Sequence, residues 1–481
     1  MLFNSYIFIF LFLPLCLALY FGCNKKKWYN LGLIVLIGMS FWFYAYNQIG
    51  YLLLLICSIG CNWFISRILV KRKTKYLKQF LVSGIVINIL VIFYFKYLNF
   101  VIFNINRFRE TPFHIKEIML PLGISFFTFQ QVSYLVDSYR GETKQYNFLE
   151  YVAFVSFFPQ LVAGPIVLHK EIIPQFRMLE KKFFNWDSFA GGLYVFAVGL
   201  FKKVIMADTF GTAVNWGFEH LGILSSMDLI IVMLSYTFQI YFDFSGYSDM
   251  AIGIAKMFNI DIPHNFNSPY KATSIIEFWE RWHMTLTRFL RQYIYYPLGG
   301  NRKGKARTYI NILIVFVVSG IWHGASWTFI VWGLLHGIAN VLNRIFKGTW
   351  ERLHVAFQWL CTFVFINMTW MIFRADSVGE AYDILKRIIR LDTFEINLEL
   401  YWSFSLTEFN YLKGIGPIVN SVAGFWMWFF LGMGLFICLN MTDVAKKEFK
   451  PTVKRMIGTV IALFWSVISL GGISTFLYFN F

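Results

Sequence analysis

Three histidines lie in strongly apolar surroundings, and their chemistry makes them the first candidates for function. His283 ends the segment Glu-Phe-Trp-Glu-Arg-Trp-His, His323 lies in Trp-His-Gly-Ala-Ser-Trp, and His336 lies in Leu-Leu-His-Gly. An ionisable side chain among apolar segments is costly to bury, so each is a functional candidate. Neutral imidazole, with a reference pKa of about 6.5, can take a proton from a hydroxyl near neutral pH. Gly324 leaves room for close approach beside His323, which makes His323 the best candidate for a general base.

The other two histidines have structural explanations that compete with a chemical role. Taken by itself, His283 is better explained as an interfacial histidine bonded to a backbone carbonyl. For His336 we also favour a structural role, because a continuous helix would place it on a different face from His323. The spacing of the three matches no short zinc pattern, and neither a cysteine nor an HExxH motif accompanies them. The sequence therefore predicts no metal site.

A run of polar residues from Ser235 to Asp249 forms a second group of candidates. Gln239 and Asp243 are four residues apart and share one face of a helix. Asp243 is a tentative substrate-binding residue. Interhelical hydrogen bonding or helix capping remains the favoured explanation of a single intramembrane Asp.

The segment that precedes His283 is rich in tryptophan and arginine. Trp279 and His283 are expected to be i,i+4 partners on one helix, with Trp282 next to them. An amphipathic segment of this composition is typical of a helix that lies at a membrane interface.

A glycine-rich turn, Pro297–Lys303, follows this segment and leads into the basic residues Arg302, Lys303, Lys305 and Arg307. Backbone amides in such a turn can hold an anion. The same basic residues are explained at least as well by the preference of positive charge for the cytoplasmic side of a membrane.

The composition indicates what kind of secondary-structure elements position these residues. The chain has 481 residues, of which 58% are hydrophobic, 21% aromatic and 14% charged, and its net charge is +17. Soluble proteins are about 25% charged, so the chain lacks the polar surface of a soluble protein. So many aromatic residues also exclude a disordered chain, and six cysteines are too few for a disulfide scaffold of this length.

Apolar runs of nearly 20 residues predict about a dozen transmembrane helices. The predicted spans are Leu2–Phe21, Leu31–Tyr46, Ile49–Ile65, Phe80–Tyr97, Tyr151–Val167, Phe189–Ala207, Leu229–Phe242, Tyr309–Ile321, Trp327–Val341, Ala356–Phe373, Phe425–Leu439 and Ile457–Tyr478. Leu2–Phe21 is expected to be a retained helix and not a signal peptide. Pro121 and Gly123 interrupt Ile118–Val136, which is expected to be short or re-entrant. The fold class is therefore an all-α polytopic membrane protein.

Basic residues cluster after the first and third spans, around Arg302–Arg307 and around Lys446–Arg455. Because positive residues remain cytoplasmic, this pattern places both termini outside the cytoplasm and the loop of Arg67–Lys78 inside. Nucleic-acid binding is excluded, since these clusters lie between hydrophobic spans and no soluble basic domain accompanies them.

We expect a single membrane domain over residues 1–481. Within it, 235–340 is the expected catalytic segment, 376–424 a surface helix and an extracytoplasmic loop, and 425–481 a C-terminal helix pair. Gly379–Arg390 has apolar residues at helical spacing and predicts the surface helix.

Several of these motifs together resemble the membrane-bound O-acyltransferase (MBOAT) family. The resemblance rests on Leu120–Gln130, Phe157–Ile166, Gly199–Val204, Tyr236–Met250, Asn265–Tyr270, Glu277–His283, Pro297–Lys303 and Trp322–Trp327. It covers about residues 1–375 and is densest for the AlgI-like branch, the bacterial polysaccharide O-acetylation proteins, whose relatives include PatA and DltB.

The resemblance implies a bundle of tilted helices around a transmembrane tunnel, in a bacterial plasma membrane. It implies acetyl-CoA as the cytosolic acyl donor, with no bound cofactor, and an extracytoplasmic glycan, such as alginate or a cell-wall polymer, as the final acceptor. An SGNH-type transferase or an acyl carrier outside the membrane would be the partner protein. The essential histidine of the family corresponds to His323, and its second position corresponds to His283.

The resemblance also frames tentative roles for neighbouring residues. Trp279, Trp282, Trp322 and Trp327 would surround the histidines and exclude water. Arg302 and Lys303 are possible contacts to the phosphates of CoA. A covalent acyl-enzyme at Ser326 is less favoured than direct transfer, because no third orienting group is evident. The alternatives from other classes are a transporter or flippase of glycan intermediates, and a scaffold of a polysaccharide secretion complex.

Overall fold

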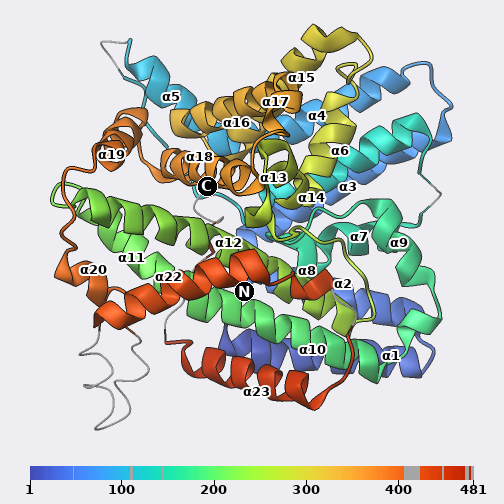
Figure 1. The fold of residues 1–481 in the computed structure, drawn as a ribbon. Coiled ribbons are helices and arrows are strands. Elements are labelled where there is room, and N and C mark those ends of the chain that lie inside the picture. Colours follow the sequence, from blue (N-terminus) through green and yellow to red (C-terminus); the bar gives the residue numbers. More distant parts are fainter. Residues whose placement is uncertain are drawn as a thin grey trace. The chain divides into compact units, whose positions relative to one another are not determined.

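The computed structural model describes residues 1–46, 48–108, 112–116, 118–143, 146–405, 423–446, 449–471 and 476–477. Every regular element in these ranges is a helix, as Figure 1 shows. Within the described residues, eight helical stretches are long and apolar enough to cross a membrane: Phe8–Lys25, Ile49–Lys71, Leu77–Asn106, Trp186–Glu219, Ser226–Met257, Gly304–His323, Val355–Arg374 and Gly424–Lys446. An all-α polytopic membrane protein is therefore confirmed.

The remaining predicted spans correspond to shorter or interrupted helices. Leu31–Tyr46 corresponds to α2 (Tyr29–Ala45) and Trp327–Val341 to α16 (Trp327–Ile345). The last predicted span, Ile457–Tyr478, corresponds to α23 (Val453–Ile468), and part of its C-terminal portion lies outside the described residues.

The predicted span Tyr151–Val167 is wrong. Two short helices, α7 (Phe148–Ser156) and α8 (Phe158–Leu161), occupy this region, and the chain is non-helical from Val162 to Leu168. The helix breaks at Phe157, whose ψ of 106° lies outside the helical range. Pro165 has no backbone N–H to donate, so the segment beyond α8 does not continue as a helix.

The chain forms two compact units. The first contains residues 1–196, 250–264 and 449–451. Its helices are α1 (Leu13–Lys25), preceded by the π-helical turn Phe8–Phe12, then α2, α3 (Ile49–Lys71), α4 (Leu77–Ile92), the π-helical turn Phe93–Tyr97, α5 (Leu98–Asn106), α6 (Ile124–Arg140), α7, α8, α9 (His169–Arg177), the 3₁₀ turn Glu180–Lys182 and the start of α10 (Trp186–Phe201).

In the first unit, two groups of buried polar side chains are paired with one another. Asn62 and Asn88 exchange a hydrogen bond of 2.7 Å between α3 and α4. His169 Nε2 lies 3.1 Å from a carboxylate oxygen of Asp137, and its Nδ1 lies 3.3 Å from the Tyr146 hydroxyl. Such pairing is needed because a buried polar group without a partner is costly.

The second unit contains the described parts of residues 197–249, 265–448 and 452–481. Its elements include the π-helical turn Lys202–Ala207, α11 (Asp208–Glu219), most of α12 (Ser226–Met257), the 3₁₀ turn Pro269–Lys271, α13 (Ile275–Arg281), α14 (Met284–Leu290), the π-helical turn Arg291–Tyr295, α15 (Gly304–His323), α16, α17 (Lys347–Trp350), α18 (Val355–Arg374), α19 (Val378–Arg390), α20 (Leu398–Trp402), α22 (Ala423–Asn440), the 3₁₀ turn Val444–Lys446 and α23.

Helices α15 and α16 pack as a close antiparallel pair, and both carry candidate histidines. A Cβ atom on Gly320 would lie 2.3 Å from the carbonyl oxygen of Phe329, and one on Gly333 would lie 2.4 Å from that of Phe316. Small residues are typical of such interfaces because they let two backbones approach closely. The two helices pack side by side (Figure 1), and they carry His323 and His336.

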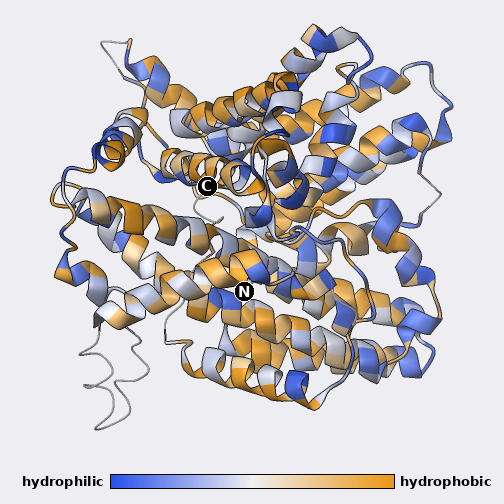
Figure 2. Cartoon of the chain, viewed as in Figure 1, coloured by the Kyte–Doolittle hydropathy of each residue, from blue (hydrophilic) through white to orange (hydrophobic). Residues whose placement is uncertain are grey.

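The surface helix predicted at Gly379–Arg390 is confirmed as α19. Ala381, Ile384 and Ile388 are its buried residues, while Tyr382 and Ile389 are exposed. This helix shows both hydrophobic and hydrophilic colours in Figure 2, whereas α22 is mostly apolar. The predicted loop after α19 lies partly outside the described residues, and the single membrane domain stays a prediction.

Candidate functional site

His283 connects α13 to α14 and adopts a left-handed backbone conformation with φ of 44°. The expected single helix through Trp279 and His283 is therefore wrong, because the chain turns at His283 and two short helices replace it. A side chain with a Cβ atom rarely adopts this conformation, and where it does so the surrounding contacts must hold it.

The contacts that hold His283 come from the segment after α12. Its Nδ1 lies 3.2 Å from Oδ1 of Asn265, and the backbone carbonyl of Asn265 accepts a 2.9 Å hydrogen bond from the Met284 amide. Thr285 donates its hydroxyl to the same Oδ1 over 2.6 Å. The His283 side chain is fully buried, and burial lowers its pKa to about 3, so that the imidazole is neutral.

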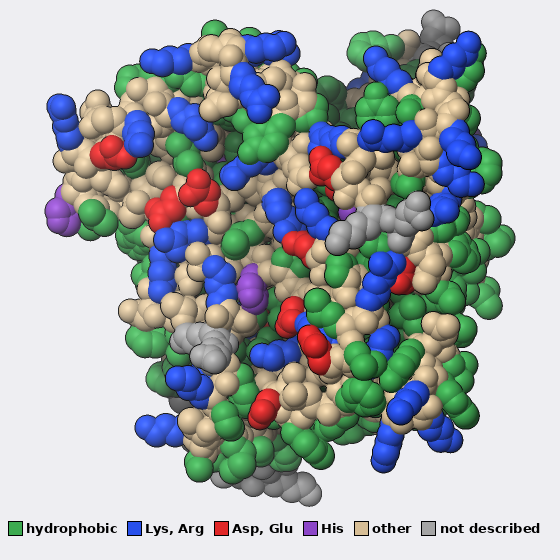
Figure 3. Space-filling view, turned by 90° about the vertical axis from the view of Figure 1, so that its right-hand side faces the viewer, with side chains coloured by type: hydrophobic (Ala, Val, Ile, Leu, Met, Phe, Trp, Pro, Cys, Tyr) green, Lys and Arg blue, Asp and Glu red, His purple; other side chains and the backbone are tan. Residues whose placement is uncertain are grey.

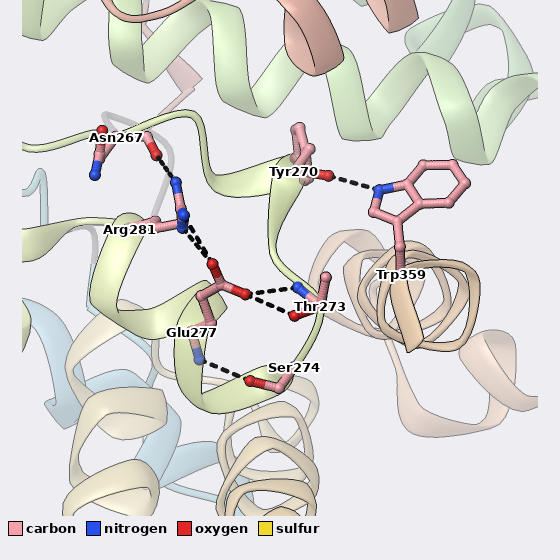
Figure 4. Close-up of polar contacts among 7 residues, drawn as sticks. All are labelled: Asn267, Tyr270, Thr273, Ser274, Glu277, Arg281 and Trp359. Carbon is pink, nitrogen blue, oxygen red and sulfur yellow. Dashed lines mark hydrogen bonds and ion pairs between the residues drawn. The ribbon is translucent and has the colours of Figure 1, made fainter. Parts of the chain in front are cut away.

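A second set of hydrogen bonds fixes α13, as Figure 4 shows. Ser274 caps the helix by accepting the Glu277 amide over 3.1 Å, and Glu277 accepts the Thr273 amide and the Arg281 guanidinium over 2.8 and 2.7 Å. Arg281 also donates to the backbone carbonyl of Asn267. Both ends of the segment that leads to His283 are thereby anchored.

His323 is the last residue of α15 and is buried among aromatic rings. The centroids of Trp322, Trp332 and Phe373 lie 4.8, 5.1 and 5.3 Å from the His323 ring. Trp322 also packs against His283 at 6.0 Å, so it contacts both candidate histidines. Trp327, which was expected to frame His323, is 49% exposed, and Trp332 and Phe373 take that place instead.

Gly324 permits the tight packing next to His323. A Cβ atom at this position would lie 2.0 Å from the ring of Phe329, and Phe329 in turn packs against Phe373 at 4.7 Å. The space that the sequence indicated beside His323 is thus filled by an aromatic side chain of the protein.

His336 is held at both nitrogens, which supports its structural role. Its Nδ1 accepts the indole N–H of Trp279 over 3.1 Å, and its Nε2 lies 3.1 Å from the Thr369 hydroxyl. An indole N–H only donates, so the hydrogen of this imidazole is on Nε2 and is directed to Thr369.

Two cavities with shared walls adjoin these helices. The inner cavity, of about 350 Å³, is lined by residues of α13 to α16 that include Trp279, Phe316 and Ser319. Ser319 is four residues before His323, one turn along the same helix. The outer cavity, of about 690 Å³, shares Ile276, Glu280, Asn301 and Arg344 with the inner one.

The outer cavity contains basic side chains. Lys305, Arg344 and Lys347 line it, together with Glu277, Glu280 and Glu351. Lys347 lies 3.6 Å from Glu351, whereas Arg344 donates to Asn340 over 3.0 Å. Lys and Arg side chains also outnumber Asp and Glu on the face shown in Figure 3.

Several predicted residues occupy other positions. Arg302 and Lys303 are exposed on the glycine-rich turn and line neither cavity, although Lys305 does. Ser326 caps α16, where it accepts the Thr328 amide over 3.3 Å. Trp282 packs against Phe278 and Trp370.

Asp243 belongs to a buried ion-pair network and not to either cavity. Its carboxylate lies 2.7 Å from Lys203 Nζ, and its other oxygen accepts the Leu477 amide over 2.9 Å. Lys202 pairs with Asp249 over 2.6 Å close by on the same elements. These contacts favour the structural explanation of Asp243, because buried charges must be paired.

Sequence reasoning missed Arg344 and Asn265. His336, Asn340 and Arg344 follow one another at intervals of four on α16, and this polar stripe was a usable signal for the cavity wall. Asn265 begins one of the motifs that carry the family resemblance, but it lies in an irregular segment, so no periodicity related it to His283. In the described parts of the chain, no group of three His, Cys, Asp or Glu side chains could hold a metal ion.

Known proteins similar to this chain are membrane acyltransferases. The model of the MBOAT, membrane-bound O-acyltransferase family, matches residues 36–377. The peptidoglycan O-acetyltransferase of Helicobacter pylori is 41% identical over 82% of this chain and 80% of its own length. The probable alginate O-acetylase AlgI of Pseudomonas aeruginosa is 37% identical over 82% of this chain and 76% of its own.

A more distant relative is the teichoic acid D-alanyltransferase of Streptococcus thermophilus, which is 29% identical over 46% of this chain and 56% of its own length. The matched family region contains His283, His323 and both cavity walls up to Gln358. This chain belongs to the membrane-bound O-acyltransferase family, and it is an acyltransferase.

Proposed function

We propose that this protein takes an acetyl group from acetyl-CoA at the cytoplasmic face of a bacterial plasma membrane and passes it to a hydroxyl on the other side. The final acceptor is an extracytoplasmic polysaccharide or cell-wall glycan. The names of the relatives, which O-acetylate peptidoglycan or alginate, support this acceptor class.

The observation that carries the proposal is the pair of adjoining cavities. The inner cavity, with Trp279, Phe316 and Leu290 in its wall, suits the narrow arm of a thioester and its small acyl group. The outer cavity, with Lys305 and Arg344, suits the phosphates of CoA, because charged donors bind phosphate oxygens strongly. Ser319 connects the inner cavity to the helical turn that carries His323.

The chemistry requires a base, and His323 would supply it. Its imidazole takes the proton of the acceptor hydroxyl while the oxygen attacks the thioester carbonyl. The tetrahedral intermediate then collapses to the acetyl ester, and the departing CoA thiolate takes the proton from the imidazolium. The aromatic wall of Trp322, Trp332 and Phe373 would exclude water, which would otherwise hydrolyse the thioester.

The orientation follows from the distribution of charge. The basic loop at Arg302–Arg307 would be cytoplasmic by the positive-inside rule, and the outer cavity would then lie on the side of acetyl-CoA. Both termini would be extracytoplasmic. A separate SGNH-type transferase or acyl carrier outside the membrane would receive the acetyl group and modify the glycan.

The proposal is tested by measuring ester-linked acetate on the surface glycans of cells that carry His323→Ala. The variant is expected to accumulate in the membrane like the wild type and to abolish glycan acetylation. His220→Ala, which alters a partly exposed histidine that contacts Trp216, is the control and should acetylate normally. Normal acetylation by His323→Ala would contradict the proposal.

A further inference from the structure

The hydrogen bonds around Asn265 determine which nitrogen of His283 carries the hydrogen. Oδ1 of Asn265 lies 3.4 Å from the backbone nitrogen of Thr285 and 2.6 Å from its hydroxyl. A backbone N–H can only donate, so the amide atom that faces it must be the oxygen. His283 Nδ1 lies 3.2 Å from the same oxygen and must therefore carry the hydrogen. The lone pair of the imidazole is then on Nε2.

The amide of Asn265 is itself held from α12. Its Nδ2 donates to the Ser248 hydroxyl over 3.3 Å, so both ends of the side-chain amide are engaged. Phe244, one turn earlier on α12, packs edge-on against the His283 ring at 4.7 Å. The orientation of the imidazole is thus fixed by contacts with two separate segments, α12 and the segment of Asn265.

The Nε2 atom of His283 has no hydrogen-bond partner among the described residues, although the side chain is fully buried. A buried acceptor without a donor destabilises the folded protein. An acceptor held in a single orientation by a buried amide is suited to receive a donor from a bound molecule.

We propose that Asn265 is a positioning residue that fixes His283 in the Nδ1–H tautomer, so that Nε2 accepts a hydrogen bond from the bound substrate. This inference rests on the proposed acyl transfer. The donor is either the hydroxyl of the acceptor or an amide N–H of the pantetheine arm of acetyl-CoA. In this tautomer His283 cannot polarise the thioester carbonyl, because Nε2 has no hydrogen to donate.

Three carboxylates on the neighbouring elements are paired with basic side chains. Asp243 and Asp249 of α12 bind Lys203 and Lys202, and Glu277 of α13 binds Arg281. On α15, the titratable side chain that packs against Trp322 is His323, and Trp322 itself packs against His283. Arg288 lies on α14, in the turn that follows His283. A new carboxylate at position 265 would therefore be the change that acts directly on the imidazole.

The test compares Asn265→Asp, Asn265→Ser and the control Asn267→Asp. Asn267 lies two residues away. Its backbone amide donates to the carbonyl of Arg281, and its backbone carbonyl accepts from the Arg281 guanidinium. A change of the Asn267 side chain therefore keeps both hydrogen bonds. Glycan acetylation in cells is measured first. The release of CoA thiol from acetyl-CoA by the purified protein in lipid vesicles is then measured between pH 5 and pH 8.

The aspartate variant keeps a hydrogen-bond acceptor but places a negative charge next to Nδ1–H, which raises the pKa of His283. Below the raised pKa the imidazolium carries a hydrogen on Nε2 and accepts nothing, so activity is lost as the pH falls. The pKa of His283 in the wild type is about 3, below the measured range. We therefore expect the new carboxylate to raise this pKa by more than about two pH units and to bring the acidic limb due to His283 into the range of pH 5 to pH 8. A shift in KM for acetyl-CoA identifies the pantetheine amide as the donor, and a shift in kcat alone identifies the acceptor hydroxyl.

Asn265→Ser should reduce the rate of CoA release about tenfold without a shift of the pH profile, because a hydroxyl can donate or accept and so fixes neither tautomer of His283. An unchanged profile for Asn265→Asp, or wild-type rates for Asn265→Ser, would overturn the inference. If Asn265→Asp does not accumulate in the membrane, the rate of CoA release by Asn265→Ser decides whether Asn265 positions His283. Failure of the proposed function is distinguishable, because His323→Ala would then retain activity whatever the residue at position 265.

Discussion

His283 and His323 pack against the same indole ring, that of Trp322, at centroid distances of 6.0 and 4.8 Å. The two histidines come from different elements, the junction of α13 and α14 and the end of α15. A single buried aromatic side chain therefore lies in contact with both imidazoles.

Trp322→Ala is expected to abolish acetyl transfer and to destabilise the protein by about 3–5 kcal/mol, because it leaves a large cavity between the histidines. Trp322→Phe should keep part of the activity. Thermal unfolding in detergent and glycan acetylation are the measurements.

The matched control is Trp327→Ala, since this tryptophan is 49% exposed. It should unfold and acetylate nearly as the wild type does. Equal losses of stability and of acetylation in the two alanine variants would mean that Trp322 has no special role between the histidines.

Gly324→Ala is expected to destabilise the protein by about 1–3 kcal/mol through overpacking, because the new Cβ would overlap the ring of Phe329. Activity should fall with it, since Phe329 and Phe373 are part of the aromatic wall near His323. Gly324 has an extended backbone with φ of −166°, so alanine causes no backbone strain and the effect is steric.

Phe329→Ala should cost less stability when it is added to Gly324→Ala than when it is made alone, because it removes the ring that the new Cβ overlaps. Gly348→Ala is the control, because a Cβ there meets nothing within 4 Å. If the double variant is less stable than the wild type by the full sum of the two single effects, the steric explanation is wrong.

Reversal of charge in the outer cavity tests whether acetyl-CoA, the acyl donor, binds there. Lys305→Glu and Arg344→Glu should each raise KM for acetyl-CoA about tenfold, or about 1.4 kcal/mol, with little change in kcat. The reason is that Lys305 and Arg344 would bind the phosphates of CoA, far from the reacting atoms. Both residues line the outer cavity.

Arg302→Glu and Lys303→Glu provide the comparison. Each makes the same change of charge on the neighbouring turn, outside either cavity, and should leave KM within about twofold. A larger rise in KM from this second pair would mean that the phosphates of CoA bind at the glycine-rich turn, as the sequence alone indicated.

The proposed orientation predicts the labelling of single cysteines in a background without the six native ones. Lys73→Cys, in the exposed loop after α3, should react with an impermeant reagent only after the cells are permeabilised. Ile49→Cys, at the opposite end of α3 and 79% exposed, should react in intact cells. The reverse pattern would invert the topology.

The fold class, the α15–α16 pair and the surface helix α19 could be predicted from the sequence, because their apolar periodicity is strong and local. The predicted helix through Tyr151–Val167 failed because Phe157 and Pro165 break a run whose composition is apolar throughout. Hydropathy measures the affinity of a segment for an apolar environment and does not report where the backbone turns.

The site was predictable only in part. His323 and Trp322 are neighbours in the sequence, so their contact needed no fold. The left-handed turn at His283 depends on Asn265, 18 residues earlier in an irregular segment, and no periodicity relates the two. The cavity walls bring together α13, α14, α15 and α16, and such a grouping is a property of packing.

The most direct test of the central claim is the transfer of radiolabelled acetyl from acetyl-CoA by the purified protein in lipid vesicles, with wild type and His323→Ala compared at equal folded amounts. Loss of a general base should slow the release of CoA and the appearance of labelled ester by about 10²–10⁴-fold, with the affinity for acetyl-CoA nearly unchanged. Transfer at the wild-type rate by His323→Ala would contradict the assignment of His323 as the base.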